Sequence, residues 1–174
     1  IKGTTEIMIQ AVIFDMDGLL IDSEPFWREA LKHTFPKAGI DLTEDMCRLT
    51  IGLRVNEVIA YWYNVKPWPQ PSFQEMEDEI INTVGRLVIE KGTPLEGTHD
   101  ILKFFKKRNL PLGLATSSAS RLIEVVLTKL NLNDYFDVVH SAEHELFAKP
   151  HPAVFLSTAA KLKTAPAECL AFED

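Results

Sequence analysis

Two aspartates separated by one residue, Asp15 and Asp17, directly follow an apolar run at residues 11–14 and precede Gly18. Four apolar residues that stop abruptly at polar ones predict a short buried β-strand. The two carboxylates then lie at the carboxyl end of that strand, where open α/β sheets bind their ligands. Because two such charges repel each other, their spacing indicates a hard divalent cation between them, most simply Mg²⁺.

Gly18 lets the backbone turn sharply or approach a ligand closely. Taken alone, the Asp-x-Asp-Gly pattern is also typical of a solvated turn, so its context decides what it indicates.

Polar residues end two further predicted strands, at residues 112–115 and 170–172. The carboxyl ends of parallel strands share one edge of a sheet, so we expect these residues to converge with the two aspartates in one pocket. Carboxylates there would bind a divalent cation, and hydroxyls with a lysine would hold a phosphate. The candidates are Thr116, Ser117, Ser118, Lys149, Glu173 and Asp174.

Each candidate also has an ordinary structural interpretation. Thr116 to Ser118 would serve equally as the N-cap of the following helix, although a helix N-terminus is itself an anion site. Lys149 in a Lys-Pro pair is typical of an exposed loop, and Glu173 with Asp174 is typical of a solvated tail. The order of all these motifs along one chain favours the pocket.

The sequence divides into two parts with different predicted secondary structure. Residues 22–93 show only helical patterns, such as the spacing of Val55, Val58, Ile59 and Trp62, whereas strands and helices alternate from residue 94 onward. This predicts an α/β fold with a doubly wound, parallel, Rossmann-like sheet and an inserted all-helical cap. We expect a core of residues 1–21 and 94–174, a cap of residues 22–93, and hinges near Ser23 and Gly97.

Composition excludes several classes of protein. The 174 residues carry 25 acidic and 18 basic side chains, a net charge of −7, which disfavours nucleic acid as a partner. No apolar run has membrane-spanning length, and no signal-peptide pattern is present. Two cysteines, Cys47 and Cys169, are too few and too far apart for a disulfide framework or a zinc site, so we expect a reducing, cytoplasmic location. We also expect a monomer. Residues 1–7 show no periodicity, and Met8 is a candidate native start.

With its four motifs in order, the chain resembles the haloacid-dehalogenase-like hydrolases. These motifs are the Asp-x-Asp-Gly after an apolar strand, Thr-Ser-Ser, Lys-Pro and a closing Glu-Asp. Within that superfamily it looks most like the capped sugar-phosphate phosphatases that act on 2-deoxyglucose 6-phosphate and hexitol phosphates. The resemblance covers nearly all of the chain from Met8 onward. It implies a Mg²⁺-dependent phosphatase whose partner is a small phosphorylated metabolite.

The resemblance also implies roles for individual residues. Asp15 matches the nucleophile that forms an aspartyl phosphate, and Asp17 matches the general acid and base. The implied phosphate-binding residues are Gly18, Thr116, Ser117 and Lys149, and the implied Mg²⁺ ligands are Asp15, Asp17 through its backbone carbonyl, Asp174 and Glu173. The family continues past the closing Glu-Asp, so we interpret the core as lacking its C-terminal part.

The cap offers one further candidate. Arg54 precedes the strongly amphipathic helix and matches a family loop that faces the site, so it is a candidate for substrate binding; an ordinary surface arginine is the alternative. Trp27, Trp62 and Trp68 are interpreted as cap core rather than sugar-stacking platforms.

Two alternatives to a phosphatase stay open on the same scaffold, a β-phosphoglucomutase-like phosphosugar mutase and a catalytically silent phosphate-binding relative. Trp27 stands twelve residues after Asp15, where the resembled mutases have a histidine, and this favours a phosphatase.

Overall fold

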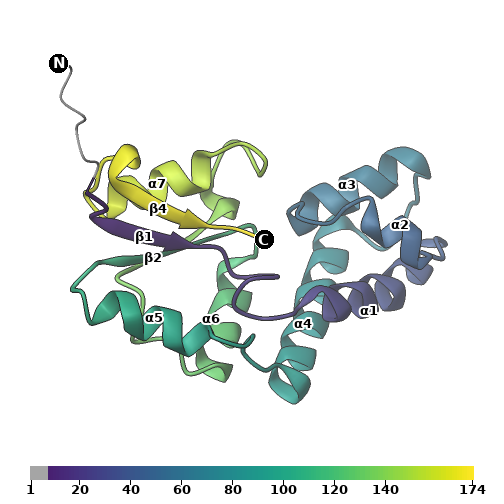
Figure 1. The fold of residues 1–174 in the computed structure, drawn as a ribbon. Helices are drawn as coiled ribbons and strands as arrows, with labels where there is room; N and C mark the ends of the chain where they lie inside the picture. The colour runs from purple at the N-terminus through teal and green to yellow at the C-terminus, as the bar shows by residue number, and fades with distance from the viewer. Residues whose placement is uncertain (1–7) are drawn as a thin grey trace.

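The computed structural model describes residues 8–174 (Figure 1), so residues 1–7, on which the suggestion of a native start at Met8 rests, lie outside the described part. Four parallel strands form one sheet in the order β3-β2-β1-β4. Their bounds are Ala11–Phe14 for β1, Leu112–Thr116 for β2, Val138–Ser141 for β3 and Cys169–Phe172 for β4. In the register, Phe14 pairs with Leu114 of β2 on one side and with Phe172 of β4 on the other. The predicted parallel α/β sheet is confirmed.

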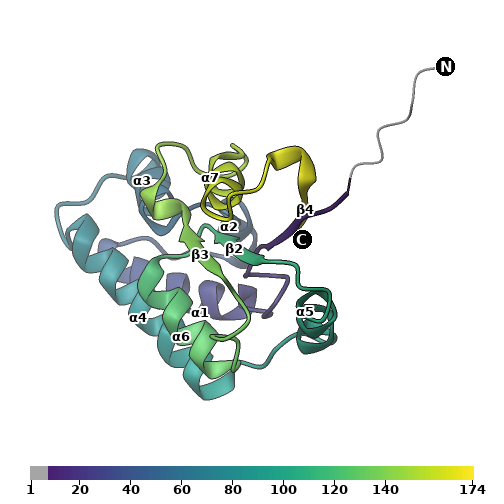
Figure 2. The ribbon, with the colours of Figure 1, turned by 90° about the vertical axis from the view of Figure 1, so that its left-hand side faces the viewer.

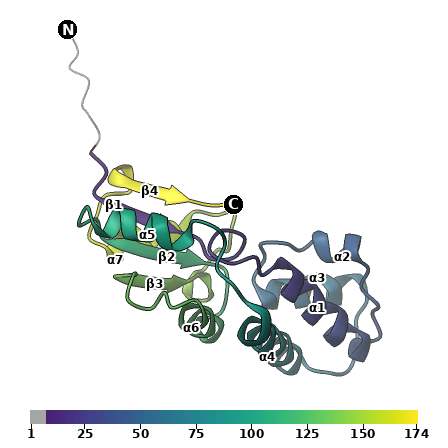
Figure 3. The same cartoon turned by 60° about the horizontal axis from the view of Figure 1, so that its bottom comes forward.

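Helices cover both faces of this sheet (Figure 3). They are α5 (Thr98–Lys106), α6 (Ser120–Lys129) and α7 (Ala153–Lys161), with short 3₁₀ turns η2 (Ala142–His144) and η3 (Pro166–Glu168). Side chains alternate between the faces, because successive residues of a strand point to opposite sides. Val12 and Phe14 pack with the cluster that includes α5 and α6, whereas Ile13 packs with Val154 and Ala159 of α7.

Four helices and a 3₁₀ turn lie together beyond the ends of the strands (Figures 1 and 3). They are α1 (Glu24–Thr34), η1 (Phe35–Ala38), α2 (Glu44–Arg48), α3 (Val55–Val65) and α4 (Phe73–Lys91). A capping box begins α4, where Ser72 and Glu75 bind each other's backbone N–H groups. Trp62 and Trp68 are buried in this group, as predicted for cap core.

The chain crosses between the helical group and the sheet twice, and the two crossings run side by side. Ile21 bridges to Pro94, and the backbone N–H of Leu95 donates to the carbonyl of Leu20 at 3.0 Å. Gly97 begins α5 with a φ of +85°, a conformation that favours glycine. We propose that the cap spans residues 22–93 and that the chain hinges near Ser23 and Gly97.

A second contact joins the helical group to the core along α4 and α6, which lie side by side in Figure 2. Arg121 of α6 pairs with Asp78 of α4 at 2.6 Å, and Lys129 donates to the carbonyl of Ile89 at 2.6 Å. In the described part of the chain, no helix combines the length and the apolar character needed to cross a bilayer.

Candidate active site

One pocket lies between the carboxyl ends of the strands and the helical group. In Figure 1 the arrowheads of β1 and β4 point toward α1–α4, and the chain ends at this boundary. The core side of the pocket brings together most of the residues singled out in the sequence, and the cap side adds mainly apolar ones. The lining from the core is Asp15, Asp17, Thr116, Ser117, Ser118, Lys149, Glu173 and Asp174.

Asp15 lies at the bottom of this pocket and is only 5% exposed. Lys149 Nζ lies 2.8 Å from Asp15 Oδ2 and 3.1 Å from a carboxylate oxygen of Glu173. Burial raises the pKa of Asp15 to about 6, against the opposing charge and hydrogen bond of Lys149. The other oxygen, Asp15 Oδ1, is buried without a hydrogen-bond partner, which is costly unless a ligand satisfies it.

Three carboxylates in the described chain lie close enough to share one cation. Oxygens of Asp15, Glu173 and Asp174 fall within 4.8 Å of one another. Gly18 permits this approach, because it has a φ of +74° and a Cβ there would collide with the Asp174 carboxylate. An all-oxygen group of this kind fits Mg²⁺, and the unpartnered Oδ1 of Asp15 leaves this residue an oxygen free to bind a cation.

Four donors surround the carboxylate of Asp17. Ser23 Oγ and Trp27 Nε1 donate to Oδ1 at 2.5 and 3.3 Å, and Ser118 Oγ and Thr116 Oγ1 donate to Oδ2 at 2.7 and 3.3 Å. Asp17 therefore joins the helical group to the end of β2. Trp27 packs against the hydrophobic core, as predicted, but its indole N–H also reaches Asp17 and the residue lines the pocket.

The Thr-Ser-Ser segment does not cap α6, since the N-cap residue is Ala119 and the carboxylate of Glu143 accepts from the first N–H of the helix, that of Ser120. Thr116 Oγ1 instead accepts from the backbone N–H of Ser118 at 3.1 Å and closes a local turn. Ser117 Oγ is buried at the pocket without a hydrogen-bond partner. This hydroxyl is therefore free to donate a hydrogen bond to an anionic ligand in the pocket.

Arg54 is not among the residues that line this pocket, although its neighbours Gly52 and Leu53 are. Its guanidinium donates to the carbonyls of Ala142 and Glu145 in the core. At 16% side-chain exposure it is not an ordinary surface arginine. The sequence predicts a substrate-binding arginine or an ordinary surface arginine, and it does not indicate an arginine that binds backbone carbonyls of the core.

The parallel sheet with helices on both faces, and the carboxylates and lysine at its carboxyl edge, fit an enzyme of the phosphoryl-transfer type. The family model of the haloacid dehalogenase-like hydrolases matches residues 12–174. The chain belongs to this family, and the resemblance seen in the sequence is confirmed.

Named relatives include phosphatases and mutases. Hexitol phosphatase B of Escherichia coli K12 is 41% identical over 172 residues, which are 98% of this chain and 78% of the relative. The solved structure of β-phosphoglucomutase from Clostridium difficile is 29% identical, with a TM-score of 0.85, over 96% of this chain and 77% of that one. CbbY from Rhodobacter sphaeroides, solved with phosphate, has a TM-score of 0.87 at 24% identity over 96% and 78%, which supports the fold alone.

Proposed function

We propose that the protein is a Mg²⁺-dependent phosphatase that hydrolyses small sugar or sugar-alcohol phosphates through an aspartyl phosphate on Asp15. The observation that carries this proposal is the arrangement at Asp15. One oxygen of a buried carboxylate pairs with Lys149, the other has no partner, and two further carboxylates lie within metal-binding distance. A site that only bound phosphate would not need a nucleophile there.

In the proposed reaction, a carboxylate oxygen of Asp15 attacks the phosphorus atom, and the bond from phosphorus to the sugar oxygen breaks. Asp17 gives a proton to the departing sugar oxygen. It then takes a proton from the water that attacks the aspartyl phosphate, which restores Asp15 and releases inorganic phosphate. Mg²⁺, held by Asp15, Asp174, Glu173 and the Asp17 carbonyl, would supply positive charge to the transferring group.

The other side chains hold the phosphate in place. Lys149 neutralises charge on the transferring oxygens, and the free hydroxyl of Ser117 donates to one of them. Thr116 is proposed to hold the phosphoryl group as well, although its hydroxyl contacts Asp17 and Ser118 in this structure. Gly18 contributes by leaving room for Asp174.

The substrate class follows from the relatives and from the lining of the pocket. Hexitol phosphatase B, at 41% identity, favours a phosphatase of hexitol or hexose phosphates over the mutase, at 29%. The cap side of the pocket combines Glu24, Trp27 and Arg28 with apolar residues such as Leu31 and Val58, a mixture that suits a small polyol.

A phosphate-release assay over a panel of hexose, hexitol and 2-deoxyhexose phosphates tests the proposal. Release should require Mg²⁺, stop with excess chelator, and return when Mg²⁺ is restored. Lys149→Met should lower the rate strongly. Asp22→Asn, which changes an exposed acid in the connection from β1 to α1, should leave the rate unchanged. Equal release with and without the metal would reject the metal-dependent mechanism, and no release from any substrate would favour a silent relative.

A further inference from the structure

Arg54 connects the helical group to the core at a place distant in sequence from both chain crossings. It precedes α3, and its NH1 donates to the backbone carbonyls of Ala142 at 3.1 Å and Glu145 at 3.0 Å. These partners follow β3 and lie 88 and 91 residues further along the chain. The side chain is 16% exposed, so the two bonds are shielded from water.

The cap holds the guanidinium of Arg54 in this orientation. Glu57 Oε1 accepts from NH2 at 2.9 Å, and Glu57 Oε2 accepts from the backbone N–H of Arg54 at 3.1 Å. Both ends of Arg54 are therefore fixed by one residue of α3. A guanidinium fixed in this way loses little entropy when it binds the core carbonyls.

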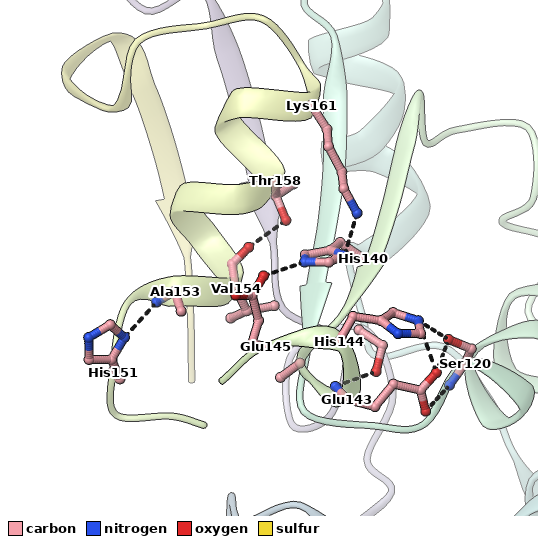
Figure 4. Close-up of polar contacts among 12 residues, drawn as sticks. Ser120, His140, Glu143, His144, Glu145, His151, Ala153, Val154, Thr158 and Lys161 are labelled. Atoms are coloured by element: carbon pink, nitrogen blue, oxygen red, sulfur yellow. Dashed lines mark hydrogen bonds and ion pairs between the residues drawn. The ribbon is translucent and has the colours of Figure 1, made fainter. Parts of the chain in front are cut away.

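Residues of the core also bind this segment (Figure 4). His140 of β3 is buried, and its Nε2 lies 2.6 Å from Glu145 Oε1. Lys161 Nζ lies 2.6 Å from His140 Nδ1, so we assign Nδ1 as acceptor and Nε2–H as donor to Glu145. Glu145 is thus bound twice, by its side chain to the core and by its backbone carbonyl to the cap.

The segment from Ser141 to Lys149 links the two phosphate-binding elements of the proposed site. Ser141 Oγ donates to the carbonyl of Ser118 at 2.6 Å, and Glu143 accepts from the backbone N–H of Ser120 at 3.2 Å. Four residues beyond Glu145, Lys149 pairs with Asp15. A shift of residues 142–145 would move the Thr-Ser-Ser turn and the lysine together.

We propose that Arg54 is a positioning residue that fixes the segment of residues 142–149, and with it Lys149, against Asp15. This goes beyond the proposed function and rests on it only for the kinetic part of the test. It replaces the expectation that Arg54 binds the sugar, because both core bonds of the guanidinium are to backbone carbonyls and Arg54 does not line the pocket. Because these bonds are to the protein backbone, the effect of Arg54 should be the same for a sugar phosphate and for an aryl phosphate.

The kinetic test compares Arg54→Ala with the wild type on a hexitol phosphate and on p-nitrophenyl phosphate. A positioning role predicts that kcat falls roughly tenfold for both substrates with little change in KM, since two charge-assisted hydrogen bonds are lost. Arg54→Lys, whose ammonium can still donate, should recover part of kcat. A rise in KM for the hexitol phosphate alone would overturn the proposal in favour of sugar binding.

Hydrogen exchange in the substrate-free protein tests the positioning without any activity. The amide of Glu145, which donates to the Ala142 carbonyl, should exchange at least about fivefold faster in Arg54→Ala. Arg48→Ala is the matched control, because Arg48 is an exposed arginine of the cap that pairs with Asp45, and the change should leave exchange at residues 142–149 unaltered. Unchanged exchange at residues 142–149 in a folded Arg54→Ala variant would overturn the proposal even if the wild type hydrolysed no sugar phosphate.

Discussion

The side chains of Asp15 and Lys149 form a buried ion pair at the end of β1, with 2.8 Å between Oδ2 and Nζ. Burial nevertheless raises the pKa of Asp15 to about 6, so below that pH a proton competes with a cation for this carboxylate in the metal-free protein. We expect the apparent affinity for Mg²⁺ to rise roughly tenfold per pH unit up to about pH 6 and to level off above it. Titration calorimetry from about pH 5 to pH 8 measures this directly.

Lys149→Met provides the control for that prediction. Lys149 lowers the pKa of Asp15, so its removal should shift the levelling-off point to a higher pH. An affinity that stays constant between about pH 5 and pH 7 would show that Asp15 does not bind the metal.

The indole N–H of Trp27 should matter for turnover, because it is one of four donors that hold Asp17 at the junction of cap and core. We expect Trp27→Phe to lower kcat about three- to tenfold, the loss typical of one hydrogen bond, while the affinity for Mg²⁺ stays unchanged. Trp62→Phe is a suitable control, since Trp62 Nε1 is buried in the cap without a partner. A kcat equal to that of the wild type would show that the contact with Asp17 is incidental.

Much of this site follows from the sequence, and the reason is geometric. A parallel sheet brings the carboxyl ends of its strands together, so the positions of Asp15, Thr116 and Glu173 after three apolar strands were enough to predict their convergence. The sequence likewise predicted the helical character of the cap from the spacing of its apolar residues.

The contacts that sequence reasoning missed all depend on how the cap sits against the core. Trp27 has the helical spacing of a core residue, yet its indole N–H points to Asp17. Arg54 bonds to carbonyls about 90 residues away, and backbone carbonyls leave no signature in the sequence. Ser23 stands at the N-cap position of α1, but its hydroxyl binds Asp17 instead of the helix. Local patterns cannot specify such partners.

The pocket should prefer substrates with one phosphate. Among the described residues that line it, only Lys149 and Arg28 are basic, and Arg28 already pairs with Glu24 at 3.9 Å and Glu44 at 3.1 Å. A second phosphate would thus meet no free cation on the cap side, so we expect kcat/KM for a hexose monophosphate to exceed that for the bisphosphate at least about tenfold.

Steady-state kinetics on the two substrates checks this preference. Replacing both Glu24 and Glu44 with Gln removes the two partners of Arg28. In this variant the ratio of kcat/KM for the monophosphate to that for the bisphosphate should be smaller than in the wild type. Equal kcat/KM values for the two substrates in the wild type would contradict this account of the cap.

Asp137 gives a prediction about stability that does not depend on function. Burial opposes its ionisation, but bonds from Lys106 and from the backbone N–H of Leu112, each at 2.8 Å, outweigh this and hold the pKa of Asp137 below its usual value. A depressed pKa stabilises the fold above the unfolded-state value of 3.8, and this contribution is lost as pH falls through the folded-state pKa.

We therefore expect Asp137→Asn to lower the free energy of unfolding by about 0.2–1 kcal/mol at neutral pH, as for a partly exposed pair. Urea denaturation at about pH 7 and about pH 3.5 would measure the difference between wild type and variant. The difference should shrink at the lower pH, and a difference that grew on acidification would contradict the assignment.

The central claim is that Asp15 transfers the phosphoryl group of a sugar phosphate to water. Phosphorus NMR of the Mg²⁺-loaded protein with a hexitol 6-phosphate, and separately with β-glucose 1-phosphate, tests it most directly. The account predicts free phosphate from the hexitol phosphate, negligible glucose 6-phosphate from the glucose phosphate, and at least about a thousandfold loss of phosphate release in a folded Asp15→Asn variant. Isomerised sugar phosphate that appears faster than free phosphate, or an Asp15→Asn variant within tenfold of the wild type, would contradict it.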